Sequence, residues 1–175
     1  MKPHYCDTGY CQDKTFSVSE DLSTVCRSVD DGDWDNCMMV VPAMAPGTGQ
    51  HTISMKLDCK GQQYMSCGVV REGALWNVDH AHFYSTMGWF IHAEDGGLFG
   101  NGKDDDDQAG DVLPGQVVTM QVDLDKGTLK FWVDGKQHGP GYTDGVTGPV
   151  QWAVSVFGQG DSVQIVPTPE LEPWQ

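Results

Sequence analysis

Residues 117–135 contain the pattern that most restricts the fold of this chain. Apolar and polar side chains alternate on both sides of a tight turn at 125–127, and an Asp-Gly turn follows at 134–135. A period of two with one apolar face is typical of an antiparallel strand with one buried side. Asp-Gly beside such runs is a strong hairpin signal, because the turn needs positive φ. The predicted inward side chains are Val118, Met120, Val122, Leu124, Leu129, Phe131 and Val133. The stretch therefore predicts a β-hairpin in an all-β sheet.

Further short apolar or alternating segments recur along the chain and are separated by turn residues. They are residues 16–19, 23–27, 38–41, 51–57, 64–70, 87–92, 96–100, 150–157 and 162–166. No helical period lasts ten residues. A chain of 175 residues suits one domain. This pattern predicts a twisted antiparallel two-sheet β-sandwich with long surface loops.

The predicted sandwich spans residues 15–166. Residues 1–14 are polar and are expected to form a lead-in. Residues 167–175 are rich in proline and are expected to form an extended, flexible tail. Within the sandwich we expect 51–57 and 64–70 to form a hairpin and 71–86 to form a long loop.

The charge of the chain limits its partners. The formal net charge is -15, and Arg27 and Arg71 are its two arginines. Phosphate backbones and anionic membranes require clustered cations, and a phosphorylated partner requires clustered arginines. The sequence therefore disfavours nucleic acid and membrane, and a neutral or basic protein partner is electrostatically easier.

The cysteines and the N-terminus bear on the compartment. No stretch approaches the roughly 20 apolar residues of a membrane span, and the first residues lack the apolar core of a secretion signal. We expect a cytoplasmic or nuclear monomer. If Leu57 opposes Tyr64 in a hairpin, Cys67 cannot reach Cys59. We therefore expect the six cysteines to be reduced thiols rather than disulfides.

Catalytic signatures are missing from the sequence. Glycosidases of the sandwich type place paired carboxylates on one strand, but the five glutamates form no Glu-x-Asp-x-x-Glu pattern. No Gly-x-Ser-x-Gly nucleophile elbow occurs either. We expect no enzyme activity and no cofactor.

Metal sites are also not expected. Cys6 and Cys11 form one C-x4-C pair without a second pair, and His80 and His82 lack further ligands. The run 104–107 lacks the spaced oxygens of a calcium loop. We interpret these residues as parts of polar surface loops.

The order of the segments resembles that of a SPRY domain. The matching segments are Gly47–Met55, Cys67–Val70, Gly88-Trp89, Asp95–Lys103, Gly115–Gly141 and Val150–Ile165. The resemblance covers residues 15 to 166 and is most specific around the hairpin. The sequence departs from the family at Ile53, where a tryptophan is usual, and at Pro140-Gly141-Tyr142, where Val-Ala-Phe is usual. A clear preceding PRY segment is absent.

The resemblance implies a non-catalytic protein-interaction module that binds a short peptide segment or surface of a partner through loops at one end of the sandwich. It implies partner contacts at Arg71, Tyr84 and Phe157. Trp76, an aromatic residue in an irregular loop, is a further candidate anchor. Trp89 and Trp152 are assigned to the core. The alternatives are a carbohydrate-binding, lectin-like module and, less favoured, a glycan hydrolase.

Overall fold

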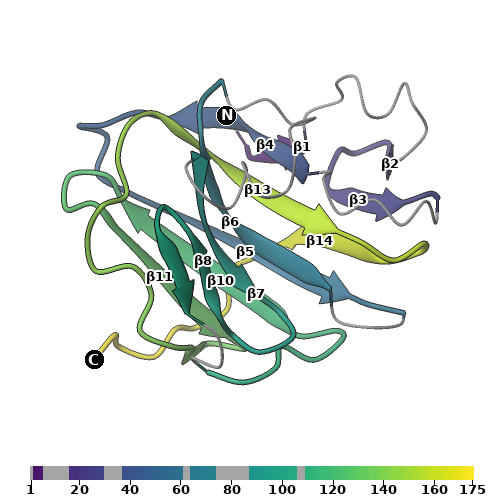
Figure 1. Cartoon of the computed structure of the whole chain (residues 1–175). Coiled ribbons are helices and arrows are strands. Elements are labelled where there is room, and N and C mark those ends of the chain that lie inside the picture. The colour runs from purple at the N-terminus through teal and green to yellow at the C-terminus, as the bar shows by residue number, and fades with distance from the viewer. Residues whose placement is uncertain (1, 6–15, 30–36, 61–63, 74–86, 106–108) are drawn as a thin grey trace.

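The computed structural model describes residues 2–5, 16–29, 37–60, 64–73, 87–105 and 109–175. Every named element in these residues is a strand, and the strands form two antiparallel sheets of seven strands each. The sheets lie face to face as the two layers of a sandwich (Figure 1). The predicted all-β, two-sheet fold is confirmed.

Sheet A contains both strands that flank the long loop predicted at 71–86. Its order is β1 (His4–Tyr5), β4 (Cys37–Met44), β13 (Val150–Val156), β6 (Met65–Arg71), β7 (Gly88–His92), β8 (Leu98–Gly100) and β9 (Lys103–Asp105). Tyr5 is fully buried, so part of the stretch that we placed in the polar lead-in belongs to this sheet.

Sheet B contains the predicted hairpin. Its order is β12 (Lys136–Gln137), β11 (Thr128–Val133), β10 (Val117–Asp123), β5 (Gln50–Asp58), β14 (Ser162–Val166), β3 (Thr24–Arg27) and β2 (Phe16–Val18). β10 pairs with β11 from Val118↔Val133 to Asp123↔Thr128. The seven side chains predicted to face inward are all buried. The hairpin prediction is confirmed.

The core fills the space between the two inner sheet faces, as expected for a sandwich. Trp89 and Trp152 are 0% and 3% exposed, in agreement with their assignment to the core. Ile53, which stands where the family has tryptophan, is buried in the same cluster. The core joins the two sheets into one body.

The predicted hairpin between residues 51–57 and 64–70 is wrong. β5 pairs with β10 and β14 in sheet B, whereas β6 pairs with β13 and β7 in sheet A. The connection after Asp58 therefore crosses between the layers. Cys59 and Cys67 are nevertheless free thiols, as expected.

Pro42 lies inside strand β4. β4 continues through this proline to Met44, and its pairing with β13 shifts register between Val150 and Trp152. Proline has no N–H to donate to a ladder, and such an irregularity accommodates it.

Candidate functional site

The structure separates the two predicted contact residues that it describes. β6 and β13 are antiparallel, with Arg71 opposite Val150 and Met65 opposite Val156. Arg71 is the last residue of β6, and Phe157 follows the other end of this pair. Six residue steps of about 3.4 Å place them roughly 20 Å apart. We call the two extremities the Arg71 end and the Phe157 end. Trp76 and Tyr84 lie outside the described residues.

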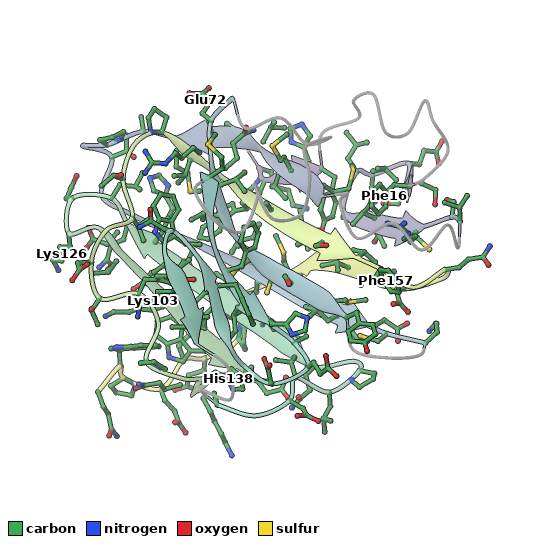
Figure 2. The ribbon with its side chains drawn as sticks, viewed as in Figure 1. Phe16, Glu72, Lys103, Lys126, His138 and Phe157 are labelled. Atoms are coloured by element: carbon green, nitrogen blue, oxygen red, sulfur yellow. The ribbon has the colours of Figure 1, made fainter. Side chains whose placement is uncertain are left out.

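The two residues also belong to different faces of sheet A. Arg71 follows Val69 by two positions and so shares the inner face of β6. Phe157 follows the inward-facing Val156 and packs edge-on against Tyr64, with ring centroids 5.7 Å apart. Figure 2 shows Glu72, the neighbour of Arg71, far from Phe157. A single pocket lined by Arg71 and Phe157 is therefore excluded.

Arg71 closes one end of the core. Its guanidinium carbon lies 5.1 Å from the centroid of the Trp89 ring, on the neighbouring strand β7. Trp89 opposes Val69, so Arg71 is its diagonal neighbour on the same face. Stacking on a buried ring holds the guanidinium in place and leaves its N–H groups for an acceptor.

Two hydrogen-bonding groups beside each other lack a partner in the described part of the chain. Arg71 is partly exposed and forms no ion pair with a described carboxylate. The buried indole nitrogen of Trp89 has no hydrogen-bond acceptor among the described residues. The partly exposed Arg71 guanidinium therefore favours an oxygen acceptor, whereas the Trp89 N–H is fully buried.

Hydrogen bonds connect the loops at the Arg71 end. The N–H of Gly47 donates to Asp125 Oδ1 at 3.0 Å, which links the β4–β5 and β10–β11 connections. The N–H of Val146 donates to the carbonyl of Gly127 at 3.0 Å, and that of Glu72 donates to the carbonyl of Pro149 at 2.8 Å. The residues around Arg71 thus come from both sheets and form one connected rim.

Two lysines lie on this rim, together with the carboxylates of Asp123 and Asp125. Lys103 begins β9, and its Nζ lies 5.6 Å from the centroid of the Tyr142 ring. Lys126 Nζ lies 3.5 Å from Asp123 Oδ2 in the β10–β11 turn. Figure 2 shows both lysines on the side of the molecule away from Phe157. Sequence reasoning missed this grouping, because the lysines are far from Arg71 along the chain.

Tyr142, which replaces the usual phenylalanine of the family, supports the rim from below. It is 3% exposed. Its hydroxyl accepts a hydrogen bond from the N–H of Phe90 at 3.3 Å and donates to the carbonyl of Phe99 at 2.6 Å. This hydroxyl therefore links the segment before β13 to β7 and β8, and β7 also contains Trp89.

The Phe157 end is built differently. The carboxylate of Asp161 accepts hydrogen bonds from the N–H groups of Gly158, at 3.0 Å, and Lys60, at 2.6 Å. The buried Arg27 donates from Nη1 to the carbonyl of Val156 at 3.1 Å. These bonds fix the loop that carries Phe157, while both charged groups are 1% exposed. This end therefore offers a fixed aromatic pair, next to an exposed ion pair between Lys60 and Asp58.

Two classes of feature are not found in the described part of the chain. Its residues contain no cluster of three or more histidine, cysteine, aspartate or glutamate side chains able to hold a metal ion. They also contain no helix long and apolar enough to cross a membrane. Cys6, Cys11, His80 and His82, at which we expected no metal site, lie outside the described residues.

Comparison with known proteins rests on structure. No family model and no curated protein matches the sequence. The SPRY domain of human HERC1 is 16% identical, with a TM-score of 0.66 over 87% of this chain and 94% of that one. The TRIM65 PSpry domain is 14% identical, with a TM-score of 0.71 over 96% of this chain and 93% of that one. A human SPRY domain is 16% identical, with a TM-score of 0.66 over 90% of this chain and 98% of that one.

The strand order, the two antiparallel layers and these matches define the class of fold. The chain is a twisted β-sandwich of the antiparallel type. More particularly, it has the fold of a SPRY domain, as the resemblance implied.

Proposed function

We propose that this chain is a non-catalytic protein-interaction module that binds a short segment or surface of a partner protein through the Arg71 end of the sandwich. The observation that carries the proposal is the Arg71 guanidinium, stacked on buried Trp89 and unpaired with any described carboxylate. The SPRY fold supports it, because the solved domains with this fold suggest an interaction role.

The chemistry of the Arg71 end favours a carbonyl-rich or carboxylate-bearing segment. Arg71, Lys103 and Lys126 bring positive charge to a chain whose formal net charge is -15. A segment with a local acceptor but an overall neutral or basic character would contact Arg71 without long-range repulsion. Trp76 and Tyr84 remain proposed aromatic contacts, because they follow Arg71 closely in the sequence.

A partner contact at Phe157 is a separate proposal. Its distance from Arg71 means that one short segment bound at the Arg71 end does not reach it, so Phe157 would contact only a larger partner surface. The proposed module works as a monomer in the cytoplasm or nucleus, and the free thiols of Cys26, Cys59 and Cys67 are consistent with a reducing compartment.

Partner capture tests the proposal. Tagged wild-type chain and the variants Arg71→Glu, Phe157→Ala and Lys136→Glu would be used to capture proteins, with photo-crosslinking and mass spectrometry to locate each contact. Lys136→Glu is the matched control, since it makes the same charge change at an exposed position on β12. We expect Arg71→Glu to reduce capture at least tenfold, about 1.4 kcal/mol, and Lys136→Glu to leave it unchanged.

Crosslinks should map to the rim around Arg71. Equal capture by wild type and Arg71→Glu, with equal melting temperatures, would overturn the proposed site. Loss of capture only in Phe157→Ala would move the binding surface to the opposite end.

The carbohydrate alternative lacks a comparable observation. Leu113 is the one large hydrophobic side chain that is exposed in the described part of the chain. Sugar-binding surfaces need exposed aromatic rings on which to stack sugars, and the described residues do not provide one. A glycan array would test the alternative directly.

A further inference from the structure

The outer face of sheet B carries a row of polar side chains that crosses four strands. Ser54 on β5 opposes Thr119 on β10, and Thr119 opposes Trp132 on β11. Trp132 in turn opposes Gln137 on β12. Their sequence neighbours Met55, Val118 and Val133 are in the core, so the row faces away from the core.

Three of these four side chains are buried although they face outward. Ser54, Thr119 and Trp132 are 1%, 0% and 3% exposed. The alternation in the sequence places Trp132 on the polar face with Lys130, where a large aromatic side chain needs a cover. The cover is the segment 167–175, which leaves β14 and runs toward β10 and β11 (Figure 1).

The tail contacts the row in order along its length. Ser54 Oγ donates to Thr168 Oγ1 at 3.0 Å, and Trp132 Nε1 donates to the carbonyl of Glu172 at 2.9 Å. The N–H of Gln175 then donates to Gln137 Oε1 at 2.9 Å. Successive strands are therefore matched by successive tail residues, as in a bound extended peptide.

Trp174 is the anchor of the tail. Its ring lies 5.0 Å from that of Trp132 at an interplanar angle of 68°, an edge-to-face contact. Lys130 Nζ lies 5.4 Å from the Trp174 ring centroid. An aromatic pair with one buried ring, Trp132, and a cation on the other ring is the kind of contact that dominates binding energy.

One glycine allows the tail to approach this face closely. A Cβ on Gly135 would collide with the carbonyl oxygen of Glu170. Gly135 also accepts a hydrogen bond from the N–H of Glu172 at 2.8 Å. The close approach of the tail backbone therefore depends on the absence of a side chain at Gly135.

We propose that the outer face of β5, β10, β11 and β12 is a second binding site, distinct from the Arg71 end, for an extended proline-containing segment with one tryptophan. Its occupant in this chain is the segment 167–175, bound in cis. Pro167, Pro169 and Pro173 restrict the unbound tail toward extended conformations, which lowers the entropic cost of binding.

Opening the site in the full chain tests this. Trp174→Ala removes the anchor and leaves the face intact. A labelled synthetic peptide with the sequence of residues 167–175 should bind this variant in a fluorescence-anisotropy titration. Wild type should bind it at least about tenfold more weakly, because the tethered tail competes at a high effective concentration. A peptide with alanine in place of its tryptophan is the matched control and should not bind.

The contribution of the Trp132 indole can be isolated. Trp132→Phe combined with Trp174→Ala keeps an aromatic ring but removes the N–H donor to the tail carbonyl. Peptide affinity should fall by up to about tenfold, the loss of one net hydrogen bond. Folding of each variant is checked by near-ultraviolet circular dichroism.

The proposal is overturned if folded Trp174→Ala fails to bind the peptide at millimolar concentration. If Trp174→Ala does not fold, a measurement on wild type tests the proposal instead. The indole N–H of Trp132 should exchange with solvent much more slowly than that of Trp174 in NMR spectra, and equal exchange would overturn the proposal. If the chain formed a dimer, and dilution removed both the dimer and the slow exchange of the Trp132 indole N–H, the site would bind the tail of a second copy. That result would overturn binding in cis.

Discussion

The two arginines of the chain have the same charge but different surroundings. Arg27 is 1% exposed, donates from Nε to the carbonyl of Val29 at 3.3 Å and from Nη1 to that of Val156 at 3.1 Å, and lies over the ring of Phe16. Arg71 is partly exposed and stacks on one ring. Arg27 therefore has a structural role, whereas Arg71 is the proposed partner contact.

Substitution of each arginine by glutamine should separate these roles. Arg27→Gln removes a buried cation from carbonyl acceptors, which then lack donors, and should lower the free energy of unfolding by about 2–4 kcal/mol. Arg71→Gln should change it by less than about 1 kcal/mol, because solvent reaches the group. Urea unfolding measures both. Similar losses in the two variants would contradict the assignment.

The buried thiols predict a pattern of chemical reactivity. Burial raises the pKa of Cys67 to about 12, and burial together with the negative charges of Asp161 and Asp58 raises that of Cys59 to about 11. The thiolate is the reactive form. At pH 8 both residues should remain unmodified by iodoacetamide in the folded chain and react fully in urea. Cys26, which is less buried, is the internal control in peptide mass spectrometry. Labelling of folded Cys67 as fast as Cys26 would contradict this prediction.

At the level of strands, the sequence predicted where elements lie better than how they pair. Alternation is local, so residues 117–135 identified β10, β11 and the turn between them. Pairing depends on distant segments, and nothing in 51–57 or 64–70 shows that β5 and β6 belong to different sheets. The same limit explains the site, because only the β6–β13 register places Arg71 and Phe157 at opposite ends.

The close contact between β6 and β7 predicts a strict requirement for glycine. A Cβ on Gly68 would fall inside van der Waals contact with the carbonyl oxygen of Trp89 and within 2.8 Å of Phe90 Cα, both backbone atoms. Gly68→Ala should therefore lower the free energy of unfolding by about 2–4 kcal/mol.

Gly102→Ala is the matched control for Gly68→Ala. Gly102 has φ +82° and open space at its Cβ position, so the substitution should cost only about 1–2 kcal/mol of backbone strain. Thermal unfolding of both variants provides the comparison. An equal or larger loss in Gly102→Ala would show that β6 and β7 adjust to the added methyl group.

Across the whole molecule, the sandwich is long enough to keep its surfaces separate. The Arg71 end carries charged side chains of both signs on a rim formed by both sheets, and the Phe157 end carries the aromatic pair with Tyr64. The outer face of sheet B is covered by the C-terminal segment. Three surfaces on one rigid core allow a partner at one of them without loss of another.

A double-mutant cycle of Arg71→Glu and Phe157→Ala tests this separation. Residues more than about 10 Å apart with no shared partner usually have additive effects to within about 0.5 kcal/mol, and the β6–β13 pair separates these two by roughly 20 Å. The double variant should therefore lose the sum of the two single losses in free energy of unfolding, measured in urea at one pH and salt concentration. A coupling above about 1 kcal/mol would mean that β6 and β13 transmit strain between the ends, and the two surfaces would then have to be treated as one.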